Sequence, residues 1–170
     1  MNKSLAKTSV AVVFLAVLGC APNAFAAEPV TRLQQAAGQP APGVQHPAWK
    51  ADELQRIIKA DDLKVSPFRE DGVTYGTPTW IWCVEVDGKL YVRAYSGTSS
   101  SWYNAAVREK AGRIIAVGMT REVTFAPEQG SVNQRIDEAY SQKYSSSPYL
   151  QGIIGEQARS ATVVITPKAQ

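Results

Sequence analysis

Residues 79–95 read TWIWCVEVDGKLYVRAY, and this stretch decides the fold. Two runs rich in β-branched and aromatic residues flank an Asp-Gly pair, the pair preferred in a two-residue hairpin turn. The residues that lie opposite one another in such a hairpin are Val86 and Lys89, Val84 and Tyr91, Trp82 and Arg93, and Trp80 and Tyr95. The sequence therefore predicts an antiparallel hairpin whose register is set by Asp87-Gly88.

Side chains alternate along a strand, so this hairpin has two faces of different character. The small, apolar face is expected to meet the core, and it carries Ile81, Cys83, Glu85, Leu90, Val92 and Ala94. The other face carries the four opposed pairs, with two Trp, two Tyr and one Arg. Two interpretations of that face stay open. It forms an aromatic-capped barrel interior or partner surface, or it forms one wall of a planar-ligand pocket with Arg93 over an indole.

Hydrophobic periodicity outside the hairpin places the other elements. Helices are expected at about 49–60, 102–111 and 132–144, and strands at 63–65, 73–75, 113–117, 120–126 and 161–166. Ser100 or Ser101 is expected to cap the second helix, and Gly112 to end it. Strands outnumber helices and adjoin as hairpins, which predicts an α+β fold: an antiparallel split β-barrel with a few peripheral helices.

The first 26 residues are typical of a secretory signal. Lys3 and Lys7 precede a nine-residue apolar run and then Ala-Phe-Ala at residues 24–26. A membrane span needs ~20 apolar residues, so none is expected here. We expect a signal peptide over 1–26, a flexible leader over 27–46 and a domain over 47–170, in a periplasmic or secreted protein. The alternative to cleavage after Ala26 is a lipoprotein box in which Cys20 carries a lipid anchor.

Charge and residue content exclude several classes of function. Once Lys3 and Lys7 are removed the chain is nearly neutral and has no basic cluster, so no nucleic-acid partner is expected. The single histidine, His46, stands beside a proline in the leader, which argues against Ser-His or Cys-His catalysis and His-ligated metals. Cys83 is the one cysteine left after cleavage and is expected to be buried and unreactive. No catalytic residue is assigned, and no metal site is expected.

The stretch SPFREDGVTYGTPTWIWCVEVDGKLYVRAYSGTSSSWYNAA (66–106) resembles the bacterial family catalogued as domain of unknown function 2255. The similarity continues through GRIIAVGMTREVTFAP, SPYL and ARSATVVITP. This family resembles the flavin-binding split barrels, which include pyridoxamine-phosphate oxidases and deazaflavin-dependent nitroreductases. The resemblance implies a flavin or deazaflavin cofactor and a homodimer. In those groups a hydroxyl-rich segment corresponding to Arg93, Tyr95 and residues 96–101 binds the cofactor phosphate, but here Ser100-Ser101-Trp102 replaces the usual basic residue.

Candidate ligand-binding residues come from the aromatic hairpin face and the loop after it. They are Trp80, Trp82, Arg93, Tyr95, Ser96, Gly97, Thr98, Ser99, Ser100, Ser101 and Trp102. The loop leads into a helix whose first N–H groups can receive an anion, with Arg93 as the nearest cation; the alternative is an ordinary helix cap.

Three functions are compatible with these residues. A periplasmic small-molecule binding or accessory protein ranks first, ahead of a flavin- or deazaflavin-type oxidoreductase, with a protein-interaction module third. The oxidoreductase ranks lower because the phosphate-site cation is missing. In addition, the signal lacks a twin arginine, and export of an unfolded chain would strip a non-covalent cofactor.

Overall fold

The computed structural model describes residues 47–169. The expected signal peptide, Cys20 and the leader at 27–46 lie outside the described residues. Within the described part of the chain, no helix has both the length and the apolar character needed to cross a membrane.

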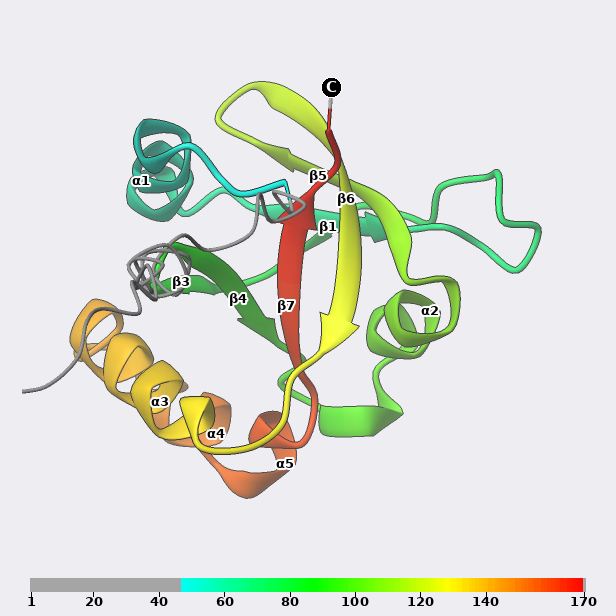
Figure 1. The fold of residues 1–170 in the computed structure, drawn as a ribbon. Helices are drawn as coiled ribbons and strands as arrows, with labels where there is room; N and C mark the ends of the chain where they lie inside the picture. The colour runs from blue at the N-terminus through cyan, green and yellow to red at the C-terminus, as the bar shows by residue number, and fades with distance from the viewer. Residues whose placement is uncertain (1–46, 170) are drawn as a thin grey trace, which may run out of the picture. The chain divides into compact units, whose positions relative to one another are not determined.

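The described residues form one seven-stranded antiparallel sheet with five α-helices around it (Figure 1). The strands are β1 (Lys64–Pro67), β2 (Thr79–Trp80), β3 (Cys83–Val86), β4 (Lys89–Arg93), β5 (Ala111–Ala116), β6 (Met119–Pro127) and β7 (Thr162–Pro167). The helices are α1 (Ala51–Ala60), α2 (Ser101–Glu109), α3 (Val132–Lys143), α4 (Leu150–Ile153) and α5 (Glu156–Arg159), with a 3-10 turn, η2, at Gly97–Ser99. The predicted α+β split barrel with peripheral helices is confirmed.

The order of the strands explains why the sheet curls. It runs β2-β1-β5-β6-β7-β4-β3, so the two edge strands, β2 and β3, are consecutive in the chain. Only Ile81 and Trp82 lie between them, which forces the two edges of the sheet to approach each other. The chain changes partners at this point, because Ile81 N–H donates to the Leu63 carbonyl and β3 then pairs with β4. The barrel is therefore split at Ile81-Trp82.

The Asp87-Gly88 hairpin forms with the predicted register. Val84 lies opposite Tyr91 and Val86 opposite Lys89. Both turn residues have positive φ, 53° and 71°, as this turn type requires. The predicted pairings of Trp82 with Arg93 and of Trp80 with Tyr95 are wrong. The ladder ends at Cys83, and Trp80 instead lies opposite Lys64 in β1, because the split divides the 79–86 run into two strands.

Two other local predictions need correction, and two short helices were missed. Residues 73–75 form no strand, only a single bridge between Phe68 and Tyr75. Gly112 does not end α2; Lys110 ends it in a left-handed conformation (φ 55°), and Gly112 lies in β5 opposite Pro67. The short helices α4 and α5 were not predicted. Each is a single turn, too short to show hydrophobic periodicity.

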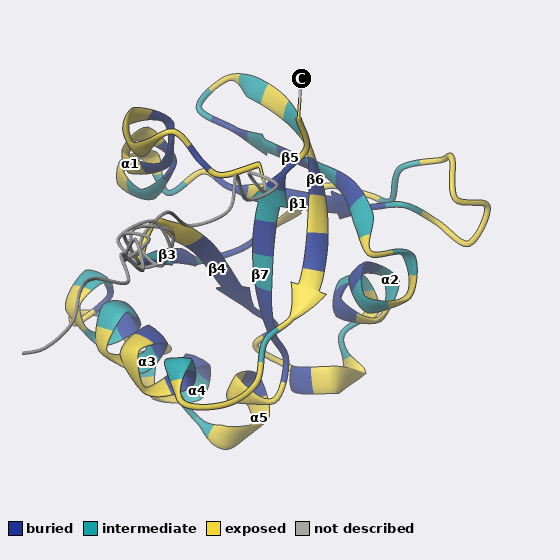
Figure 2. Cartoon of the chain, in the orientation of Figure 1, coloured by how far each residue is buried: buried dark blue, intermediate teal, exposed yellow. Residues whose placement is uncertain are grey.

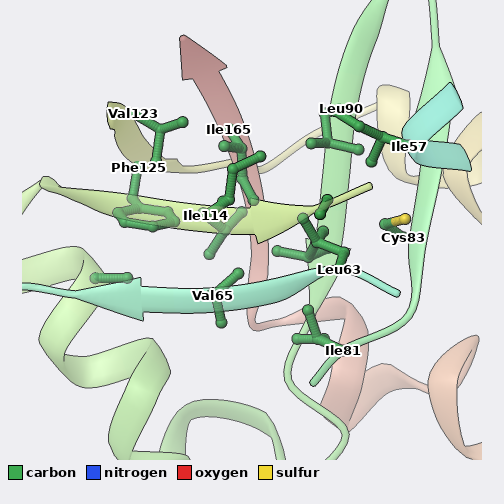
Figure 3. Packing of buried hydrophobic residues seen from close by; sticks show 14 of the residues in the cluster. Ile57, Leu63, Val65, Ile81, Cys83, Leu90, Ile114, Val123, Phe125 and Ile165 are labelled. Atoms are coloured by element: carbon green, nitrogen blue, oxygen red, sulfur yellow. The ribbon is translucent and has the colours of Figure 1, made fainter. Parts of the chain in front are cut away.

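The two faces of the hairpin enter two different hydrophobic clusters. Five of the six residues predicted for the core face are buried: Ile81, Cys83 and Leu90 inside the curled sheet (Figure 3), together with Val92 and Ala94. The sixth, Glu85, is only half-buried and lies outside this cluster. On the opposite face Val84, Val86 and Tyr91 are buried against α3, α4 and α5 (Figure 2). Helices thus cover most of the face for which two interpretations were open. At the end of this face near the split, Trp80 and Tyr95 are exposed.

Candidate functional site

A cavity of about 530 Å³ lies at the split in the barrel. We call it the aromatic cavity, and its lining consists of Thr79, Trp80, Ile81, Trp82, Arg93, Tyr95, Ser96, Ser100, Trp102, Tyr149 and Ile153. Seven of these are candidate residues from the sequence: Trp80, Trp82, Arg93, Tyr95, Ser96, Ser100 and Trp102. The structure therefore brings the hairpin end and the loop after it to one place, and adds α4, which sequence reasoning missed.

Aromatic side chains dominate this cavity. Three of the four tryptophans in the chain line it, together with Tyr95 and Tyr149. The fourth, Trp49, is buried in the core and donates its indole N–H to the Ile165 carbonyl. Trp80 and Tyr95 are each 53% exposed and Tyr149 is 62% exposed, with the two tyrosine rings edge to face at 6.4 Å. Large apolar surface is thus left open to solvent at one concave site.

Asp61 holds two of these tryptophans in place. It ends α1 in a left-handed conformation, and its backbone carbonyl accepts the Trp80 indole N–H at 3.0 Å. Its carboxylate accepts the Tyr144 hydroxyl, and the Tyr144 ring stacks on Trp82 at 4.1 Å and 6°. Lys143 donates to the same carboxylate oxygen at 2.8 Å. The cavity wall is therefore fixed by α1 and by the end of α3.

Arg93 borders the cavity, but its charge is directed into the protein. The side chain is fully buried, and Nε donates to the Thr162 hydroxyl at 2.9 Å. Its two terminal nitrogens donate to Asp137, the Ile153 carbonyl and two oxygens of Asn133. These bonds use all five guanidinium N–H groups. The guanidinium lies 5.5 Å from the Tyr140 ring, so the expectation that it stacks over an indole is wrong.

The loop at 96–101 divides between the cavity and the fold. Ser96 and Ser100 line the aromatic cavity, whereas Ser99 donates its hydroxyl to the Ser96 carbonyl at 2.7 Å. Gly97 is buried, and a Cβ at that position would lie 2.7 Å from Gln157 of α5. Ser100 occupies the N-cap position of α2, but its side chain makes no capping hydrogen bond. Thr98 is exposed and lines neither this cavity nor its neighbour.

A second cavity, of about 470 Å³, adjoins the first. We call it the polar cavity, and it is lined by Pro67, Phe68, Arg69, Glu70, Gly76, Thr77, Thr79, Ser101, Trp102, Ala105 and Arg108. Thr79 and Trp102 belong to both cavities. Among the candidate residues, Ser101 and Trp102 line it. Sequence reasoning missed its arginines, because Arg69 and Arg108 are far apart in the chain and meet only after folding.

Cys83 is buried, as predicted. Burial raises the pKa of its thiol to about 11, although Lys143 lies 3.8 Å from the sulfur and opposes that shift. In residues 47–169 no group of three or more His, Cys, Asp or Glu side chains is placed to hold a metal ion.

A comparison with protein families matches most of the residues that form this fold. Residues 53–165 match the model of a family described as "Uncharacterized protein conserved in bacteria (DUF2255)". The chain belongs to this family. The DUF2255 match runs from within α1 into β7, so it includes both cavities and the Arg93 contacts. The family expected from the sequence is thereby confirmed. Comparison with curated proteins gave no match.

Proposed function

We propose that this protein binds a small molecule whose planar, apolar part occupies the aromatic cavity. The observation that carries the proposal is the convergence of Trp80, Trp82 and Trp102 with Tyr95 and Tyr149 on one concave site. Leaving apolar surface in water costs roughly 25 cal/mol per Å². Ligand pockets are typically concave, mostly apolar and lined by aromatic side chains with a few polar groups, which Ser96, Ser100 and Thr79 supply here.

The environments of Arg93 and Cys83 favour binding over catalysis. Arg93 uses all its donors within the protein. Cys83 is buried, and its raised pKa keeps the thiol protonated. Neither side chain offers an activated group to a ligand, because a nucleophile needs a lowered pKa or an adjacent base.

Calorimetric titration of the protein with 2-naphthol, a neutral planar probe, tests the proposal. We expect binding, and we expect Trp80→Ala and Tyr149→Ala to weaken it by about tenfold each, since each removes an aromatic wall. Trp49→Phe is the matched control, because Trp49 is an aromatic residue outside the cavity. The site would be refuted if wild type and the three variants bound 2-naphthol equally well, or if none of them bound it. A yellow chromophore that co-purifies with the protein would instead favour the oxidoreductase alternative.

We also propose that the protein acts outside the cytoplasm as a soluble chain beginning at Ala27. The basic start, the short apolar run and Ala24-Phe25-Ala26 support this proposal. Mass spectrometry of the exported form should give the mass of residues 27–170. A diacylglyceryl increment on Cys20 would establish the lipoprotein alternative, and an uncleaved chain would remove the proposal of export.

A further inference from the structure

The aromatic and polar cavities meet across a common wall. Thr79 of β2 and Trp102 in the first turn of α2 line both. A molecule seated against Trp102 in the aromatic cavity therefore has the polar cavity as its immediate neighbour.

The polar cavity offers the positive charge that the aromatic cavity does not. Arg69 follows β1 and is exposed, and its Nε donates to the Tyr75 carbonyl at 3.2 Å. Among the described residues, neither of its terminal nitrogens has a hydrogen-bond partner. Arg108 of α2 pairs with Glu109 at 2.6 Å and lies 3.8 Å from Glu70, whose side chain is 85% exposed. The Arg108–Glu70 pair is exposed on both sides, and such pairs are weak, so an incoming anion can displace Glu70 from Arg108 and can also reach the exposed Arg69.

The geometry points to a ligand in two parts, a planar apolar body in the aromatic cavity and an anionic group in the polar cavity. This inference rests on the proposed binding function and specifies its ligand class. Guanidinium groups recognise carboxylate and phosphate through paired N–H donors, and the hydroxyls of Thr77 and Ser101 line the same cavity. The anion is thus placed near Arg69 and Arg108, and not near Arg93 as the sequence suggested.

Three probes with one ring system and different charge test this inference: 2-naphthol, 2-naphthoate and 2-naphthyl phosphate. In calorimetric titrations at low salt we expect both anions to bind at least about tenfold more tightly than 2-naphthol. The double variant Arg69→Gln, Arg108→Gln should bring the anions to the affinity of 2-naphthol and leave 2-naphthol unchanged. Glu70→Gln should tighten the anions, because it removes a competing carboxylate. The exposed Arg135, which lines neither cavity, supplies the control Arg135→Gln.

The outcomes separate this inference from the proposed function. Equal affinity for all three probes, unchanged in the double variant, would overturn the inference and leave the aromatic site standing. Binding of none of them would overturn both. Inorganic phosphate that binds as tightly as 2-naphthyl phosphate, with no effect of Trp80→Ala, would show an independent anion site and overturn the two-part ligand. The relative affinities of 2-naphthoate and 2-naphthyl phosphate tell which anion the arginines prefer.

Discussion

A buried arginine is tolerated when its charge and every N–H find a partner, and Arg93 meets both conditions. Asp137 neutralises it and also pairs with Arg159 of α5. The remaining donors bind Asn133 of α3, the Ile153 carbonyl of α4 and Thr162 of β7. One strand residue thus joins three elements that are distant in the sequence.

Replacing Arg93 should therefore lower stability more than any surface arginine. We expect Arg93→Met to reduce the free energy of unfolding by about 3–5 kcal/mol, because Asp137 loses its buried partner. Urea denaturation measures this difference. The control is Arg135→Met, which breaks an exposed ion pair with Asp87 and should leave the midpoint near that of wild type. Similar midpoints for the two variants would contradict the role given to Arg93.

Cys83 should react slowly while the protein is folded. Its thiol is fully buried, and burial raises its pKa from 9.0 to about 11. The shift alone lowers the thiolate fraction near neutral pH by about 100-fold. A bulky thiol reagent should label Cys83 at least about 100-fold more slowly in buffer than in urea. Rapid labelling in buffer would contradict burial.

At the scale of elements, Gly97 allows η2 to pack against α5. Its φ is +64°, and a Cβ would lie 2.7 Å from both the side chain and the backbone carbonyl of Gln157. Gly118 shares the left-handed backbone (φ +71°) but has no atom within 4 Å of that position. Substitution of these two glycines by alanine therefore separates the free-energy cost of left-handed backbone from that of a steric clash.

We expect Gly118→Ala to cost about 1–2 kcal/mol, the penalty of left-handed backbone for an L-residue. Gly97→Ala should cost about 1–3 kcal/mol more, because the Gln157 backbone cannot move without shifting α5. Urea denaturation of both variants gives the comparison. If the two lose equal stability, η2 and α5 are not packed as described.

Local signals account for the elements that the sequence predicted. Asp87-Gly88 fixes its hairpin through backbone conformations that only a few residues adopt, and α1 and α3 are long enough to show periodicity. The division of residues 79–86 into β2 and β3 depends on a distant partner: β1 pairs with β2, and Leu63, directly before β1, accepts the Ile81 N–H. No signal within 79–86 reports that partner.

At the scale of the whole molecule, the sequence likewise predicted those parts of the candidate site that are close together in the chain. The sequence placed Trp80, Trp82, Tyr95 and Trp102 together because one hairpin and the next helix carry them. It missed Tyr149, which directly precedes α4, and Ile153, the last residue of α4. It also directed Arg93 toward a ligand. An arginine on an otherwise buried strand face requires an acidic partner. The one available signal for that partner was the pair Asn133 and Asp137, which lie four residues apart on α3 and so share a helix face.

The stability of the whole domain should fall as the solution becomes alkaline. Burial raises the pKa of Cys83 from 9.0 to about 11. It also raises the pKa of Tyr140 and Tyr144 above 10.0, and for Tyr144 the hydrogen bond to Asp61 adds to the effect. Above these reference values the unfolded chain releases protons that the folded protein retains. Because the native state then binds more protons, the free energy of unfolding decreases as pH rises.

Single substitutions can separate the contributions of Cys83 and Tyr144 to this loss of stability at high pH. Wild type should lose stability from pH 9 upward, and Cys83→Ala should remove the part of the loss between pH 9 and about 11. Tyr144→Phe should remove part of the loss that begins near pH 10, whatever its effect at neutral pH. Tyr149→Phe is the control, because it removes the hydroxyl of a tyrosine that is 62% exposed. Urea midpoints measured from pH 7 to pH 11 supply the profile. Equal slopes in all four proteins would mean that these groups are solvated, and the burial of Cys83 and Tyr144 would have to be abandoned.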